Sequence, residues 1–186
     1  GRPSSAMLIT CQSGFEELLR AETSAHGLGA VLASGAGWVR LEPKPAAELP
    51  ELCFAHRVLL EPAEIVGDSV NALAGRLCDW FLTSLRGEKV EGPWPNVWQA
   101  PIEIPGLGRR LGAVEDEFGV LLKKRLSRVS KLATGELPRG TGPARGLFVF
   151  AADFGRIYAA RAVWLGGQRR MADDSAAPSR SYLKTE

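Results

Sequence analysis

The sequence predicts an α+β protein built from two successive units, the second of which ends in a β-hairpin. Three observations lead to this fold class: short apolar runs of strand length, two long stretches whose apolar residues recur at helical spacing, and turn-forming residues between them. With 186 residues, of which 45% are hydrophobic and 24% charged, the chain can bury one ordinary core or two small ones. No apolar run approaches the roughly 18 residues of a membrane-spanning helix, so we expect a soluble globular protein.

We assign residues 1–66 to the first unit, in which residues 1–6 form a flexible lead. Its expected elements follow the order of a ferredoxin-like fold, namely a strand at 7–12, a helix from 13–14 to 26–27, strands at 30–33 and 37–41, a helix at 46–54 and a strand at 57–66. Pro62 interrupts the last strand. Because proline cannot donate to a sheet ladder, we place it on an edge or at a bulge.

The second unit is expected to span residues 67–168. Asp68 is a candidate N-cap for its first helix, and the longest helix should cover residues 111–131, with Arg125 inside the apolar arc and therefore in need of a partner. The expected elements are a helix at 70–85, a proline-rich turn at 92–95, a strand at 97–104, the long helix, a mobile loop at 132–144, and a hairpin with strands at 147–152 and 157–164. We interpret residues 169–186 as a linker and the start of another domain.

The net charge of +2 conceals a strong regional imbalance. Residues 1–104 carry 8 Lys and Arg against 13 Asp and Glu, whereas residues 105–170 carry 13 against 5. A positive field confined to one part of a small protein is what a polyanionic partner needs, because contacts to phosphates are additive and release counterions. Solvated surface charge is the alternative interpretation of the same pattern.

Several elements of the second unit contribute to this basic region, and we predict that they contact RNA. Some of the cationic residues point away from the apolar arc of the long helix. Others lie at its N-terminus, where backbone N–H groups favour phosphate, and the rest follow the helix along the chain. The candidate RNA-binding residues are Arg109, Arg110, Lys123, Lys124, Arg128, Lys131, Arg139, Arg145, Arg169 and Arg170. Trp94, Trp98, Tyr158 and Trp164 are aromatic residues that could stack on bases, although core packing explains most of them equally well.

Other kinds of site find weaker support in the sequence. Residues 106–112 hold glycines at the start of a helix, as in a dinucleotide-binding turn, but the third glycine is displaced by one position and no acidic strand end follows. Cys53 and His56 have metal-like spacing but supply two ligands where zinc needs three or four, so we expect no metal site. His26 and His56 are weak candidates for a general base. The three cysteines are odd in number and far apart, which fits a reducing cytoplasm.

Two segments resemble a known enzyme family. The stretch Leu8 to Glu16, followed by an apolar-periodic helix, is similar to the start of the FtsJ-like bacterial large-subunit rRNA cytidine 2′-O-methyltransferases, whose front half contains a THUMP domain. The segment Ala177 to Glu186, APSRSYLKTE, resembles the Pro-Ser-Arg-Ser-x-x-Lys-x-Glu segment with which their catalytic domain opens. Thr185 departs from the larger apolar residue of that pattern and leaves Lys184 intact.

The resemblance implies that residues 67–168 are a THUMP-like RNA-binding domain serving a methyltransferase. In this family the lysine matched by Lys184 belongs to a Lys-Asp-Lys-Glu set that positions and deprotonates the ribose 2′-hydroxyl for attack on the methyl group of S-adenosylmethionine. The other three residues and the cofactor loop would follow Glu186. The resemblance therefore implies that rRNA and a downstream methyltransferase domain are the partners of this chain, which alone is not catalytic and holds no cofactor.

Two other functions remain open at this stage. The second unit could be a THUMP domain that serves a different RNA-modifying enzyme, such as a thiouridine synthase. Alternatively, the chain could be a protein-interaction module in which exposed aromatic residues bind a partner and the basic region is incidental.

Overall fold

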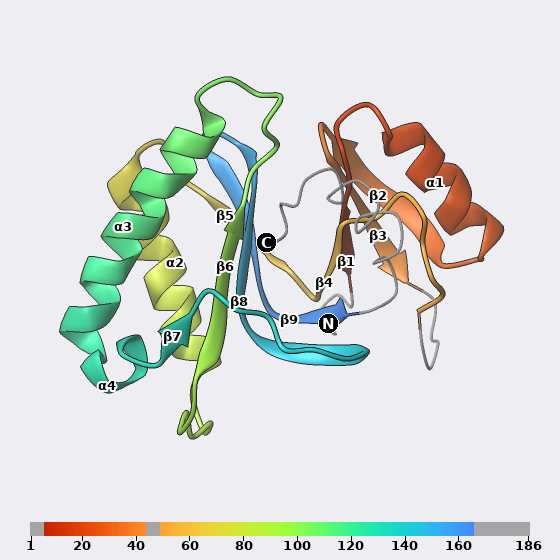
Figure 1. The fold of residues 1–186 in the computed structure, drawn as a ribbon. Helices are drawn as coiled ribbons and strands as arrows, with labels where there is room; N and C mark the ends of the chain where they lie inside the picture. Colours follow the sequence, from red (N-terminus) through yellow and green to blue (C-terminus); the bar gives the residue numbers. More distant parts are fainter. Residues whose placement is uncertain (1–5, 44–48, 166–186) are drawn as a thin grey trace, which may run out of the picture. The chain divides into compact units, whose positions relative to one another are not determined.

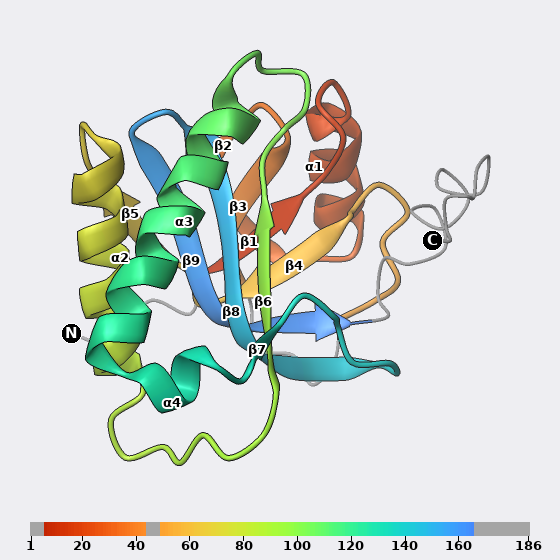
Figure 2. The ribbon, with the colours of Figure 1, turned by 60° about the vertical axis from the view of Figure 1, so that its left-hand side comes forward.

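The computed structural model describes residues 6–43 and 49–165 and has an α+β fold, as predicted (Figures 1 and 2). The chain divides into two compact units. Unit 1 consists of residues 1–61, 139–144 and 163–186, and unit 2 consists of residues 62–138 and 145–162. Neither unit is a single continuous stretch. Among the described residues, no helix combines the length and the hydropathy that a membrane crossing requires.

The described residues of unit 1 form an antiparallel sheet with the strand order β2-β3-β1-β4 and one helix. Its elements are β1 (Met7–Thr10), α1 (Glu16–Ala25), β2 (Gly29–Gly35), β3 (Trp38–Pro43) and β4 (Arg57–Leu60). Met7 and Ile9 project from one face of β1 into a core shared with Leu19 of α1. The strand, helix, strand, strand portion of the predicted order is confirmed.

The second helix predicted for this unit is wrong over the residues that the structure describes. Residues 49–52 have no regular secondary structure and residues 53 and 54 form a turn, whereas residues 44–48 lie outside the described residues. The Glu22 carboxylate accepts hydrogen bonds from the backbone N–H groups of Cys53, at 2.5 Å, and Phe54, at 3.1 Å. These donors are satisfied by a side chain of α1, and Leu52 is buried beside them, so the segment is anchored without forming a helix.

The predicted strand over residues 57–66 divides into two strands that belong to different units. β4 ends at Leu60, and β5 (Ala63–Val66) pairs with a strand of unit 2. Glu61 has a φ of 49°, a left-handed conformation, and Pro62 follows it with no N–H to donate. The interruption expected at Pro62 is therefore a complete break in the strand.

Unit 2 is a mixed sheet covered on one face by helices, with the strand order β5-β9-β8-β6-β7 (Figure 1). β6 runs parallel to β8, whereas β5 and β9 are antiparallel. The further elements are α2 (Val70–Ser84), β6 (Trp94–Gln99), α3 (Leu107–Arg125), α4 (Ser127–Ser130), β7 (Ala133–Thr134), β8 (Gly142–Asp153) and β9 (Arg156–Leu165). The long final hairpin predicted from the sequence is confirmed and is extended at its open end.

The core of unit 2 lies between its sheet and the helices α2 and α3. Each helix contributes buried residues spaced three and four positions apart, which places them on one face. They are Leu73, Ala74, Leu77, Cys78 and Phe81 in α2 and Leu107, Leu111, Val114, Phe118 and Leu122 in α3. The rings of Phe81 and Phe118 meet edge to face, with centroids 5.8 Å apart, and fix the two helices against each other.

Four predicted details of unit 2 need correction. α2 is capped by Ser69, whose hydroxyl accepts from the Ala72 N–H, and not by Asp68. The strand expected at 97–104 ends at Gln99, and residues 102–106 form turns that leave Ile102 92% exposed. The helix expected at 111–131 begins at Leu107 and breaks at Leu126, where φ is −154° and ψ is 69°. The loop expected at 132–144 contains β7 and the first residues of β8.

The shift of β6 toward the N-terminus has a local cause. The backbone N–H of Trp94 donates to the carbonyl of Leu132 at 3.1 Å, and its indole Nε1 donates to the carbonyl of Val129 at 2.9 Å. Buried tryptophan needs a partner for its indole N–H, and α4 supplies one. The strand therefore starts at Trp94, inside the proline-rich stretch that predicts a turn.

Candidate nucleic-acid interface

The predicted basic residues of α3 fall into two groups at opposite ends of the helix. Arg109 is exposed in the first turn, whereas Lys123 and Lys124 are exposed in the last. At a rise of 1.5 Å per residue, Arg109 and Lys123 are about 21 Å apart along the helix axis. The three acidic residues at 115–117 lie between them, so the basic surface of α3 is not continuous. Burial raises the pKa of Glu115, and the charge of Asp116 adds to this shift.

The C-terminal end of α3 is the more basic of the two ends. Lys123, Lys124 and Arg125 occupy its last turn, where cations interact favourably with the helix dipole. Arg125 finds the partner that its place in the apolar arc requires, because its Nη1 lies 2.7 Å from Asp79 Oδ1 of α2. This hydrogen bond raises the pKa of Arg125 above its usual value.

α4 joins this end of α3 to the connection between α2 and β6. Arg128 of α4 donates a hydrogen bond from Nη1 to the carbonyl of Val90, at 3.0 Å, and Lys131 is exposed at the end of α4. In Figures 1 and 2, α4 and the connection after α2 lie at the same end of unit 2. We call this region the basic end and define it as residues 84–94 and 122–131 together with Arg145 and Arg161. It contains nine Lys and Arg residues against two Glu residues.

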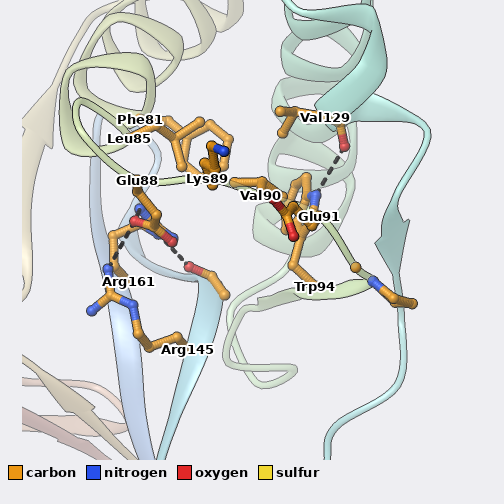
Figure 3. Close-up of a pocket in the computed structure, with 13 residues that line it drawn as sticks. Phe81, Leu85, Glu88, Lys89, Val90, Glu91, Trp94, Val129, Arg145 and Arg161 are labelled. Carbon is orange, nitrogen blue, oxygen red and sulfur yellow. Dashed lines mark hydrogen bonds and ion pairs between the residues drawn. The ribbon is translucent and has the colours of Figure 1, made fainter.

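A pocket of about 210 Å³ opens in the basic end (Figure 3). Its apolar wall comes from the end of α2, the start of β6 and α4, through Phe81, Leu85, Trp94 and Val129. Charged residues of the connection and of the paired strands β8 and β9 also line the pocket: Glu88, Lys89, Glu91, Arg145 and Arg161.

Two arginines of this pocket meet a single carboxylate. Arg161 of β9 approaches both oxygens of Glu88, with Nη2 3.1 Å from Oε2 and Nη1 3.3 Å from Oε1. Arg145 of β8 places Nη2 3.2 Å from Oε1 of the same Glu88 side chain. The hydrogen bonds from Arg161, followed by its charge and the contacts of Arg145, lower the pKa of Glu88 despite partial burial. Glu88 is therefore ionised at neutral pH.

The structure brings together only some of the residues predicted to contact RNA. Five of them lie in the basic end: Lys123, Lys124, Arg128, Lys131 and Arg145. Arg110 donates from Nε to the carbonyl of Phe154 at 3.1 Å and, with Arg109, belongs to the other end of α3. Arg139 belongs to unit 1. Arg169, Arg170 and Lys184 lie outside the described residues.

Glu88 and Arg161 are absent from the residues predicted from the sequence. Arg161 carried a signal, because it is a charged residue inside the apolar strand segment from Ile157 to Trp164. A cation in such a segment needs partners, since burying an unpaired charge is costly. Glu88 lies in an irregular connection and has no comparable local signal.

The glycine-rich turn and the Cys53 to His56 pair do not form the sites for which they were considered. Gly106 is the N-cap of α3, with a φ of 83°, and it follows turns and not the end of a strand. Within residues 6–43 and 49–165, no three His, Cys, Asp or Glu side chains come together in a way that could hold a metal ion.

No protein-family model and no curated protein matches the sequence. Among solved structures, the chain is similar to a possible methylase from Clostridium difficile 630, with a TM-score of 0.53 and 18% identity over 88% of this chain and 42% of that one. It also matches TrmN from Thermus thermophilus, with a TM-score of 0.49 and 22% identity over 89% of this chain and 47% of that one. SMU.472, a putative methyltransferase complexed with SAH, matches with a TM-score of 0.45 and 11% identity over 90% of this chain and 43% of that one.

At these identities the similarity concerns the fold, and of these three matches the one to the Clostridium difficile protein has a TM-score above 0.5. The chain spans less than half the length of each of the three solved proteins. Its fold is therefore found as one part of a larger protein described as a possible methylase.

Proposed function

We propose that this chain is the RNA-binding region of an S-adenosylmethionine-dependent RNA methyltransferase. The basic end of unit 2 carries the proposal, because it gathers cations from α3, α4, the connection after α2 and the hairpin on one small unit. Cations from separate elements that converge on one surface provide additive contacts to a phosphate backbone. The fold shared with part of a possible methylase supports the enzyme class.

The residues in the basic end indicate how RNA would be bound. Lys123, Lys124 and Lys131 are exposed, and no hydrogen bond or ion pair of theirs is found among the described residues, so they are available to phosphates. Arg128 is partly committed to the carbonyl of Val90 and would contribute its charge from a fixed position. Lysines act as flexible point charges, so this surface would bind RNA through phosphate positions and helix shape, without sequence-specific contacts to bases.

The finer assignment rests on the sequence of residues 177–186. We propose that they begin a catalytic domain of the FtsJ-like type, in which Lys184 helps to position and deprotonate a ribose 2′-hydroxyl of large-subunit 23S rRNA. An alcohol is a weak nucleophile at neutral pH and needs a nearby base and a fixed geometry. A THUMP domain of another RNA-modifying enzyme remains the alternative, and it shares the RNA-binding role of unit 2.

The pocket of the basic end is smaller than a usual cofactor site. Sites for drug-sized ligands and cofactors occupy about 300 to 1,000 Å³, whereas this pocket has about 210 Å³. We therefore assign methyl transfer to the proposed catalytic domain and the capture of RNA to unit 2. In this arrangement both parts belong to one cytoplasmic enzyme.

Binding of an rRNA fragment to the whole 186-residue chain, measured by fluorescence anisotropy at low salt, tests the proposal. Reversal of Lys123, Lys124 and Lys131 to Glu should weaken binding broadly across RNA sequences. Arg20 and Arg156 serve as controls, because each already has a carboxylate partner, Glu17 at 3.9 Å and Glu64 at 3.4 Å. Their replacement by Gln should leave RNA affinity nearly unchanged.

Two results would contradict the proposal: no RNA binding by the wild-type chain at low salt, or full affinity in the triple variant. In the first case a protein-interaction module becomes the better explanation. The exposed apolar side chains of unit 2 would then be the surface to test, by pull-down with the wild-type chain and with polar replacements at Val66, Ile102, Val120 and Phe154.

A further inference from the structure

The pocket of the basic end holds more positive charge than its own carboxylate neutralises. Glu88 carries one negative charge and faces two guanidinium groups, those of Arg145 and Arg161. Lys89 and Glu91, which also line the pocket, offset each other. One positive charge is left over at a site with an apolar wall, where an incoming anion would meet a less polar surrounding than in open water.

Arg161 is held in place before any ligand arrives. Its side chain is 12% exposed, and its Nε donates to the carbonyl of Gly146 at 2.7 Å. Its Nη1 donates to the hydroxyl of Ser84 at 3.1 Å, and the guanidinium carbon lies 5.3 Å from the centroid of the Phe81 ring. A cation fixed by several contacts loses little conformational entropy when it binds an anion, which favours binding.

Arg145 and Glu88 are the adjustable members of the group. The Arg145 side chain is 61% exposed, and its contact with Glu88 joins it to a carboxylate that is itself 31% exposed. Glu88 follows Gly87, whose φ of 77° belongs to the left-handed region that glycine adopts without strain. The carboxylate is therefore carried by an exposed connection just beyond α2, and it can move aside without disturbing a helix or a strand.

The size of the pocket selects a small ligand. About 210 Å³ is below the volume of usual cofactor sites but accommodates a single phosphate group with part of its ribose. Arginine binds phosphate through two parallel hydrogen bonds, so two arginines that share one carboxylate offer a suitable donor set.

We propose that this pocket binds one phosphate group of RNA, which takes the place of the Glu88 carboxylate beside Arg145 and Arg161. This inference rests on the proposed RNA-binding function and assigns a specific phosphate site to it. Glu88 acts as an internal competitor: in the free protein it satisfies the arginines, and the RNA phosphate displaces it. The site gives one defined anchoring point within a surface that otherwise binds through diffuse charge.

The proposal differs from a purely structural role of the three residues in a measurable way. If Glu88 only bridges β8, β9 and the end of α2, its replacement by Gln weakens the fold and adds nothing to binding. If Glu88 competes with phosphate, Glu88→Gln strengthens phosphate binding. Glu91→Gln is the matched control, because it removes an equal charge from the same pocket lining, and no contact of Glu91 with an arginine is found among the described residues.

The first arm of the test uses inorganic phosphate and the whole chain, measured by isothermal titration calorimetry at constant ionic strength with chloride as the reference anion. Wild-type protein should bind phosphate, and Arg145→Ala should bind it roughly tenfold more weakly, as expected for the loss of a charge-assisted hydrogen bond. Arg156→Ala, which disrupts a different arginine–glutamate pair, should bind like the wild type. Arg145 is chosen over Arg161 because its exposed side chain can be removed without loss of folding.

The second arm uses RNA hairpins that carry either a 5′-phosphate or a 5′-hydroxyl, measured by fluorescence anisotropy. Glu88→Gln should raise RNA affinity by severalfold more than Glu91→Gln does. A difference between the two hairpins in the wild type that disappears in Arg145→Ala identifies a terminal phosphate. Equal binding of the two hairpins by the wild type, with weaker binding of both by Arg145→Ala, identifies an internal phosphodiester.

Equal phosphate affinity in the wild type and Arg145→Ala, or equal effects of Glu88→Gln and Glu91→Gln on RNA, would overturn the pocket assignment even if RNA binds. Absence of RNA binding by the wild type would instead overturn the proposed function and with it the assignment of the phosphate to RNA. The calorimetric arm still decides whether the pocket binds phosphate.

Discussion

The three exposed lysines of the basic end make a quantitative prediction about salt. For each phosphate contact, the logarithm of the binding constant changes with the logarithm of the salt concentration with a slope of about −0.7 on single strands and about −0.9 on duplexes. Replacing Lys123, Lys124 and Lys131 by Gln should therefore make the slope less steep by roughly 2 to 3. When the salt concentration rises from about 50 to about 200 mM, the factor by which affinity falls should be roughly 20 to 40 times smaller for the variant than for the wild type.

Fluorescence anisotropy titrations with one rRNA fragment at four or more salt concentrations would measure this slope. Circular dichroism and thermal unfolding would establish that the variant remains folded. Arg20→Gln and Arg156→Gln provide the baseline, because each of these cations already has a carboxylate partner. A triple variant whose slope equals that of the wild type would refute our reasoning, since the lysines would then contact no phosphate.

Three further predictions concern stability and are measured by urea or thermal unfolding. Ser69→Ala should cost about 1 kcal/mol because it removes the N-cap of α2, whereas Asp68→Ala should cost much less; equal costs would contradict the capping assignment. Gly146→Ala should destabilise the protein by about 1 to 3 kcal/mol, because an added Cβ would lie 2.4 Å from a backbone carbonyl oxygen of β6. In Gly112→Ala the added Cβ meets nothing within 4 Å, so this change should stabilise the protein by up to about 1 kcal/mol. The reverse order of stabilities would contradict this packing. The pKa of Glu88 is lowered in the folded state, so its carboxylate stabilises the fold above the unfolded pKa of about 4.3, and this stability is lost as the pH falls through the folded pKa. The wild type and Glu88→Gln should therefore become equally stable at acid pH. A difference in stability that stays constant with pH would contradict this linkage.

Local patterns were sufficient to predict most elements of the fold. The spacing of apolar residues predicted α2 correctly and located α3 to within a few residues at its start, because both helices bury one regular face. The errors occur where contacts distant in sequence override local preference. Glu22 of α1 supplies acceptors to residues 53 and 54, where a helix was predicted, and Val129 fixes the start of β6 through the indole of Trp94.

The candidate site was less accessible to prediction than the fold. The regional charge imbalance at residues 105–170 covers the parts of the candidate site that come from α3, α4 and the hairpin, but not residues 84–94. The cations at the end of α3 followed from helical spacing. The convergence of Arg145 and Arg161 on Glu88 depends on sequence separations of 57 and 73 residues, which no local pattern encodes. The separation of the basic residues of α3 into two groups by the acidic residues 115–117 could be recognised only once the start and length of the helix were known.

The way β8 and β9 contribute residues to both units has a consequence for the order of events during synthesis. Residues 139–144 and 163–165 belong to unit 1, and Trp164 packs against the same core as Met7 and Ile9. A ribosome that has made residues 1–61 has therefore not yet made every side chain that covers this core. Strand β9 is also required in unit 2, where it pairs with β5 and provides Arg161. Both units therefore need the same late hairpin, which couples their completion in time and delays the assembly of the basic end until β9 has emerged.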